Sequence, residues 1–194
     1  MLDSWGSFFK PKQLGTVLHK KYAVAAPIVG LYYIINFMCC VSACNFYSDE
    51  SRKASCVSPD GIVYTFDEDQ KSSMILDTAI LIAGIFHVIE WLRTTILLTV
   101  VVIGATNLMW AYYALGLNTI FGIVALVFVH LSYFGEGAYC KDAQPTRYTW
   151  LLVEVIFFWA LFWFFQYPFW VLFCCKQEAV HDAINAKDDD DEED

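Results

Sequence analysis

The sequence lacks the short motifs that identify most soluble enzymes. It has no Walker phosphate loop, no Gly-rich dinucleotide fingerprint and no Gly-x-Ser-x-Gly nucleophile turn. It contains seven cysteines but no Cys-x-x-Cys pair, which excludes a zinc ribbon. It also has no basic stripe, and its formal net charge is −9, so no nucleic-acid partner is expected. These absences favour a non-enzymatic role, and we predict no cofactor.

Two further absences concern targeting. No Asn is followed two positions later by Ser or Thr, so the chain has no N-glycosylation acceptor. No cleavable signal peptide is visible, because the first apolar run begins near Tyr22 and has the length of a full span. We therefore expect this run to act as a signal anchor.

What the chain does contain is apolar and aromatic residues. They make up 58% and 18% of the sequence, and the mean hydropathy is +0.47. Soluble domains contain about 45–50% apolar residues, so this composition predicts an integral membrane protein. The 194 residues suit one compact helical domain with short loops and leave no room for a soluble catalytic domain.

The apolar runs predict an all-α, polytopic transmembrane bundle with five spans. A transmembrane helix needs about 20 apolar residues. Within one long apolar tract, the charged residues Glu90–Arg93 and the Gly116–Asn118 sequence mark the expected boundaries. Four spans are the alternative, if one middle segment is re-entrant. The five expected spans are about 22–47, 74–92, 94–114, 118–134 and 148–173.

Polar segments divide the chain into three parts. Residues 1–21 form a basic and aromatic segment suited to the membrane interface, 22–175 form a single transmembrane domain, and 176–194 form an acidic tail. The large polar loop, 48–72, contains a Pro-Asp-Gly turn followed by a short strand at 62–66. Flanking Lys and Arg residues weakly favour a cytoplasmic N-terminus. Five spans would then place the tail outside, and four would place it in the cytoplasm.

Four polar residues within the spans form the main candidate site. At about 1.5 Å per residue from the expected span ends, His87, His130 and Glu154 lie roughly 8–9 Å below one membrane surface, with Glu90 slightly above. Charged groups in hydrocarbon are costly, so these side chains should face the bundle interior. We expect Arg93 at the surface and Glu90 just beneath it.

Three interpretations of this layer remain open. The favoured one is that His–Glu pairs between helices neutralise one another and fix the packing. A second is a proton path or polar pathway. A third is a metal site for Zn or Fe made by His87, Glu90, His130 and Glu154. In the opposite half of the membrane, Asp77 and Asn107 could hydrogen-bond across helices.

The cysteines suggest two modifications. Cys44 and Cys56 would form a disulfide if the large loop is extracytoplasmic. Cys174 and Cys175 would be palmitoylated if their end is cytoplasmic. With five spans the two interpretations conflict, because both cysteine pairs would lie outside.

The function that we expect is that of a structural or accessory subunit packing against other membrane proteins or a second copy. The aromatic last span, 148–173, should contact lipid on one face and a partner or lipid pocket on another, so bound lipids are expected. The alternative is a small transporter or channel component that uses the His/Glu layer, and a membrane-embedded metalloenzyme is less favoured. The plasma membrane or endomembranes are slightly favoured as the location.

Overall fold

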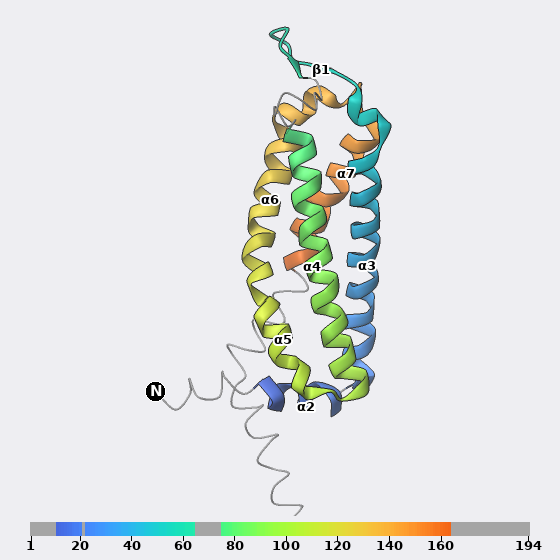
Figure 1. Cartoon of the computed structure of the whole chain (residues 1–194), viewed down its shortest axis with the longest axis vertical. Helices are drawn as coiled ribbons and strands as arrows, with labels where there is room; N and C mark the ends of the chain where they lie inside the picture. Colours follow the sequence, from blue (N-terminus) through green and yellow to red (C-terminus); the bar gives the residue numbers. More distant parts are fainter. Residues whose placement is uncertain (1–10, 21, 65–74, 164–194) are drawn as a thin grey trace, which may run out of the picture. The chain divides into compact units, whose positions relative to one another are not determined.

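The computed structural model of this chain describes residues 11–20, 22–64 and 75–163, and this part is mostly helical (Figure 1). The α-helices are α2 (Pro11–Lys20), α3 (Tyr22–Ser48), α4 (Ile75–Ile103), α5 (Met109–Ala114), α6 (Asn118–Phe134) and α7 (Pro145–Ile156). Short 3₁₀ turns cover Glu50–Lys53, Thr106–Leu108, Leu115–Leu117 and Glu136–Cys140, and a π-helical stretch covers Phe157–Phe162. Two short strands are β1 (Cys56–Val57) and β2 (Val63–Tyr64). The predicted all-α class is thus confirmed as mostly helical.

Three helical segments in the described part are long and apolar enough to cross a membrane. They are Ala25–Ser48, Leu76–Ile103 and Thr106–Phe134. A hydrocarbon core about 30 Å thick needs about 20 residues of helix, and each segment exceeds that length.

The helix boundary predicted at Glu90–Arg93 is wrong. Helix α4 runs without interruption through both residues and ends only after Ile103. No Gly or Pro interrupts the helix there, and both charged side chains are buried, at 2% and 3% exposure. The helix instead ends at Gly104, whose φ of +80° is a conformation that only glycine adopts readily.

The second predicted boundary, Gly116–Asn118, is also wrong. Leu115–Leu117 forms one 3₁₀ turn that joins α5 directly to α6, and Thr106–Phe134 is one helical segment. A 3₁₀ turn tightens a helix without reversing the chain. The long apolar tract therefore forms two long helical segments rather than three.

The chain divides into two compact units. The first contains Met1–Ile34, Leu92–Gly116 and Trp163–Asp194, and its described helices include α2 and α5. Helix α2 packs against α5 and the turn before it, where Gly15 lies so close to Met109 that a β-carbon would stand 2.9 Å from Met109 Cγ. This unit buries the cluster Leu97, Val100, Val101, Met109 and Tyr112.

The second unit contains Ile35–Trp91 and Leu117–Phe162. Phe86 of α4 lies at its centre and contacts the rings of Phe157, Phe158 and Phe162 at centroid distances of 6.4, 5.2 and 5.7 Å. Gly122 of α6 makes room for this cluster, because a β-carbon there would stand 2.7 Å from Phe86 Cε2. The aromatic cluster positions the polar groups described below.

The described part of the large loop belongs to this second unit. Strands β1 and β2 pair antiparallel around the predicted Pro-Asp-Gly turn, where Gly61 has a φ of +78°. Ahead of the hairpin, the Ser51 backbone N–H donates to the Asp49 carboxylate at 2.7 Å, and this hydrogen bond lowers the pKa of Asp49. The predicted turn is confirmed. The predicted strand at 62–66 is present at Val63–Tyr64, and residues 65–72 lie outside the described part.

Candidate functional site

The second unit contains a chain of three buried polar side chains from three helices. His87 of α4 donates from Nδ1 to Asn36 Oδ1 of α3 at 3.0 Å, since an amide oxygen can only accept. Its other nitrogen, Nε2, lies 2.9 Å from Glu154 Oε2 of α7. Asn36, His87 and Glu154 are all 0% exposed. The structure thus joins two of the four predicted layer residues, His87 and Glu154.

The contact between His87 and Glu154 must contain one proton. Because Nδ1 carries a hydrogen toward Asn36, the Nε2–Oε2 contact is either imidazolium with carboxylate or imidazole with carboxylic acid. Both states have zero net charge. A neutral pair is what a low-dielectric interior tolerates, because an unpaired buried charge is strongly destabilising.

Cys39 lies next to this pair, one helical turn after Asn36 on α3. One ligand atom from each of Cys39, His87 and Glu154 lies within 4.8 Å of the other two. The ring of Phe157 stands edge-on to His87 at a centroid distance of 4.7 Å, and Phe86 is 5.2 Å away. The cluster combines thiol, imidazole and carboxylate groups inside an aromatic enclosure.

Glu90 is separate from the His87 pair. Asn118 of α6 donates from Nδ2 to Glu90 Oε2 at 2.9 Å and to the Phe86 carbonyl oxygen at 3.3 Å. Glu90 is therefore buried within α4 and does not lie near the end of a helix as predicted. The expectation failed because it assumed a helix end near residue 92, whereas α4 is continuous there.

His130 is also separate from the predicted layer. The indole N–H of Trp159 faces its ring, 3.3 Å from Nε2 and 3.4 Å from Nδ1, and the two centroids are 5.6 Å apart. The ring of Phe134 also lies near it, at a centroid distance of 5.0 Å. Depth along a helix does not specify which face a residue occupies, and His130 lies on an outer aromatic face.

Arg93 belongs to the first unit and is buried rather than at the surface. Its Nη2 donates to the Tyr112 hydroxyl at 3.0 Å, and its guanidinium carbon lies 4.6 Å from the centre of the same ring. A planar guanidinium stacks on an aromatic ring more readily than an ammonium does. The hydroxyl and the ring of Tyr112 both contribute to accommodating this buried cation within α4.

A second buried ionic cluster, with Asp77 at its centre, lies at the loop end of the second unit. Asp77 accepts a very short hydrogen bond from Arg147 Nη2, and Arg52 Nε lies 3.3 Å away. Arg147 also donates to Gln144 Oε1 at 2.5 Å and to the Phe46 carbonyl oxygen at 2.8 Å. Asp77 therefore pairs with arginines, whereas Asn107, its predicted partner, is exposed in the first unit.

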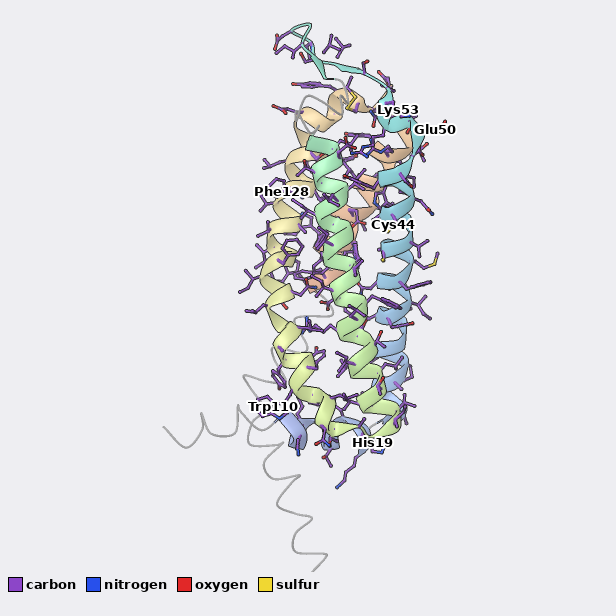
Figure 2. All side chains as sticks on the ribbon, in the orientation of Figure 1. His19, Cys44, Glu50, Lys53, Trp110 and Phe128 are labelled. Carbon is purple, nitrogen blue, oxygen red and sulfur yellow. A yellow bond between two sulfur atoms is a disulfide. The ribbon has the colours of Figure 1, made fainter. Side chains whose placement is uncertain are left out.

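The disulfide prediction has the wrong partner. Cys56 bonds to Cys140, and Cys44 is a free, exposed thiol on α3 (Figure 2). The bond ties the large loop to the segment before α7, where Gln144 Nε2 also donates to the Ala54 carbonyl oxygen at 2.8 Å. Cys174 and Cys175 lie outside the described residues, so the structure does not address their palmitoylation.

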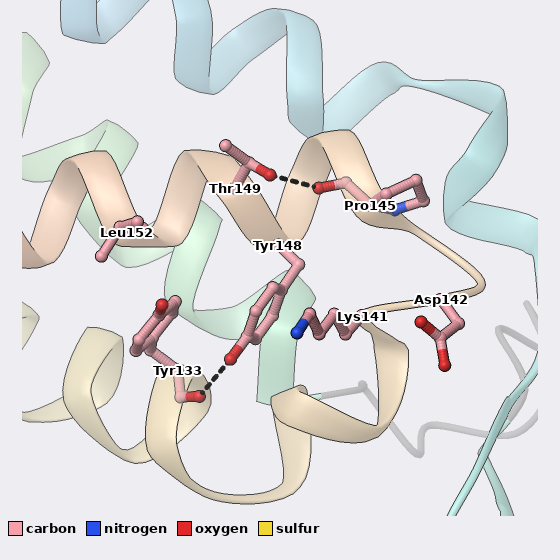
Figure 3. A pocket seen from close by; sticks show the side chains of 7 residues that line it. All are labelled: Tyr133, Lys141, Asp142, Pro145, Tyr148, Thr149 and Leu152. Atoms are coloured by element: carbon pink, nitrogen blue, oxygen red, sulfur yellow. Dashed lines mark hydrogen bonds between the residues drawn. The ribbon is translucent and has the colours of Figure 1, made fainter.

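A surface pocket of about 420 Å³ lies at the start of α7, next to the segment that contains Cys140 (Figure 3). Its aromatic side is made by Tyr133 and Tyr148, whose rings stack at 4.8 Å, with the Tyr148 hydroxyl donating to the Tyr133 carbonyl oxygen. Lys141 and Asp142 place opposite charges at its rim. The pocket is open and is separate from the buried groups.

Sequence reasoning missed two residues of the buried cluster, Asn36 and Cys39. Their spacing of three places them on one face of α3, which was a usable signal. It also missed Arg147, because a residue at an expected span end was counted only as a flanking charge. Comparison of the chain with family models, with curated proteins and with solved structures finds no match.

Proposed function

We propose that this chain is a four-span integral membrane protein that acts as a structural or accessory subunit. The proposed spans are α3, α4, the segment Thr106–Phe134 and the helix that begins at Pro145. An even number of spans puts the segment before α3 and the segment after the last span on one side. The two longer loops then share the opposite side.

The disulfide and the positive charges support one orientation. Cys56 and Cys140 lie in the two loops that share a side, and disulfides persist in oxidising compartments. The other side collects Lys10, Lys12, Lys20, Lys21, Lys176 and Lys187. On the loop side, Arg52 and Arg147 are paired with Asp77, which leaves Lys53, Lys71 and Lys141 against the six lysines of the other side. We therefore place the N-terminus and the acidic tail in the cytoplasm, which fits the plasma membrane or endomembranes.

One observation carries the subunit role: the buried polar side chains contact one another within the chain, while the outward faces are apolar. His87 and Glu154 are 0% exposed, whereas α3 and α6 present large exposed aliphatic side chains. The outward aliphatic residues include Leu31, Ile34, Met38, Ile120, Ile123 and Val127. Such a molecule is built to pack laterally in a bilayer.

The site that we assign to a partner helix is an apolar groove of about 240 Å³ between α3 and α4 in the second unit. Ala43 and Gly84 supply small residues there, and Leu81, Ile85 and Val88 line it. Membrane helices associate where small residues allow close backbone approach, so a transmembrane helix of another protein fits this groove.

Photo-cross-linking in native membranes tests this role. A photoreactive residue replacing Leu81 should yield an adduct with one defined membrane protein. Ile85→Trp should fill the groove and abolish that adduct. Ile123→Trp is the matched control, because both isoleucines are 44% exposed and belong to the same unit. Adducts with lipid alone, or equal loss in both variants, would contradict the proposal.

The transport alternative requires water to reach the His87–Glu154 pair. Both residues are sealed in this conformation, and this is why we prefer the subunit role. Proton flux into liposomes that is lost in Glu154→Gln would favour transport instead.

A further inference from the structure

We infer that Cys39, His87 and Glu154 form a structural zinc site linking α3, α4 and α7. Going beyond the subunit role, this assigns a ligand to the buried cluster. Its three ligand atoms come from three helices and lie within 4.8 Å of one another. Thiolate, imidazole and carboxylate are the three side-chain ligands that zinc takes in proteins. The set differs from the third interpretation of the sequence, a metal site of His87, Glu90, His130 and Glu154, since Cys39 replaces Glu90 and His130.

The spacing of the nitrogen and oxygen ligands is already close to that of a zinc site. His87 Nε2 and Glu154 Oε2 are 2.9 Å apart. Two such ligands at 2.0–2.2 Å from a tetrahedral ion stand about 3.3 Å apart. The site would form if the distance between His87 Nε2 and Glu154 Oε2 increased by a few tenths of an ångström and the Cys39 sulfur moved closer to both atoms.

Asn36 provides the outer support that metal-binding histidines require. A ligating imidazole almost always donates its second ring N–H to an oxygen, which sets the tautomer and the ring orientation. His87 donates from Nδ1 to Asn36 Oδ1 at 3.0 Å, leaving Nε2 directed at the cluster. The ring is thus held with the lone pair of Nε2 available to an ion.

The charge balance suits an apolar interior. One Zn²⁺ ion, one thiolate, one carboxylate and a neutral imidazole sum to zero. Binding releases two protons, one from the Cys39 thiol and one from the His87–Glu154 contact. No charge is then left uncompensated among the surrounding rings of Phe86, Phe157 and Phe158.

Glu154 provides an independent sign that the cluster is incomplete. Its second oxygen, Oε1, is buried and has no hydrogen-bond partner among the described residues. A buried carboxylate oxygen without a partner is costly, and bidentate coordination by Glu154 would satisfy it. That mode brings the number of donor atoms to four, in a distorted geometry because the two carboxylate oxygens share one carbon.

Metal analysis of the full-length protein tests this inference. The protein is expressed with zinc, without a histidine tag, and purified in mild detergent by gel filtration. We expect about one zinc per chain in the wild-type protein and in Cys40→Ala. The adjacent Cys40 lies outside the cluster, so it is the matched control. We expect at least a fivefold loss in Cys39→Ala and in Glu154→Gln.

Each outcome is decisive. A wild-type protein without stoichiometric zinc, or zinc retained in Cys39→Ala, overturns the site. A different transition metal that is lost with the same variants overturns the zinc assignment. If those variants fail to fold, Co²⁺ is loaded into wild type and Cys40→Ala. Both should show thiolate-to-cobalt charge-transfer absorption, and its absence overturns the inference. These readouts are independent of any partner, so they separate this site from the subunit role.

Discussion

At the scale of single residues, Asp77 shows how this helical core accommodates charge. Its carboxylate faces Arg147 and Arg52, and Arg147 is fully buried. Removing one partner of a buried ion pair costs about 3–5 kcal/mol, because the other charge stays buried without compensation. We expect Asp77→Asn to lower the free energy of unfolding by about that amount, measured by thermal or SDS unfolding in detergent.

The matched control is Glu50→Gln, which removes a carboxylate from the exposed side of the neighbouring turn. This variant should unfold within about 0.5 kcal/mol of wild type, as surface substitutions usually do. Equal stability of Asp77→Asn and Glu50→Gln would show that the Asp77 cluster contributes nothing to the fold.

Gly122 makes a second prediction at this scale. A β-carbon there would lie 2.7 Å from Phe86 and 2.9 Å from Phe162, so Gly122→Ala must displace the aromatic cluster. Overpacking of this kind costs about 1–3 kcal/mol. Gly30→Ala meets nothing within 4 Å and should instead stabilise α3, by up to about 1 kcal/mol. Thermal unfolding of both variants checks this, and a stabilised Gly122→Ala would refute the packing.

The polar residues also show what a sequence can specify about a buried site. Their presence in apolar runs correctly marks His87, Glu90 and Glu154 as side chains that the structure buries. Their partners could not be predicted, because depth along a helix leaves the direction of each side chain open. His130 demonstrates this: it lies against Trp159 on an outer face, apart from His87.

At the scale of elements, Gly104 is the residue that ends α4. Its φ of +80° disfavours any side chain, and a β-carbon would also lie 3.0 Å from His19 Nε2. A hydrogen bond of 2.9 Å between His19 Nδ1 and the Val101 carbonyl oxygen fixes the position of this ring. We expect Gly104→Ala to cost about 1–2 kcal/mol of stability, the usual penalty of the left-handed conformation.

Gly116→Ala is the control, because Gly116 lies in the 3₁₀ turn before α6 with nothing within 4 Å of its β-position. It should leave the unfolding temperature unchanged or raise it. If Gly116→Ala instead destabilised the protein more than Gly104→Ala, the result would support the turn that the sequence predicted at 116–118.

The sequence correctly predicted that the long apolar tract is helical, but it did not predict where the tract divides into separate helices. Long apolar composition correctly predicted helices, since an apolar segment in lipid must satisfy its own backbone hydrogen bonds. Charges at Glu90–Arg93 favoured a break, but Asn118 and Tyr112 supply buried partners, so the helix continues. Those partners lie 28 and 19 residues away, where local patterns carry no information.

At the scale of the whole molecule, the Cys56–Cys140 disulfide closes a long segment of chain, with a sequence separation of 84. Cross-linking a segment of this length stabilises by about 4–5 kcal/mol in the chain-entropy model. We expect the double substitution Cys56→Ser with Cys140→Ser to lower the unfolding temperature and to remove the mobility shift on reduction in a gel. Cys44→Ser should change neither, since Cys44 is free. Loss of the mobility shift in Cys44→Ser would instead support the disulfide between Cys44 and Cys56 that the sequence predicted.

The number of spans can be decided from two exposed lysines, Lys53 and Lys141. Four spans place the loops that contain them on one side of the membrane, and five spans divided at Arg93 place them on opposite sides. We expect single cysteines at these positions, in a background lacking the free thiols, to react alike with a membrane-impermeant maleimide from outside sealed cells or vesicles. Lys12→Cys and Asn107→Cys, both in the first unit, should be protected until the membrane is opened. Opposite labelling of positions 53 and 141 would contradict the four-span topology. It would also contradict the Cys56–Cys140 bond, which requires the two loops to share a compartment.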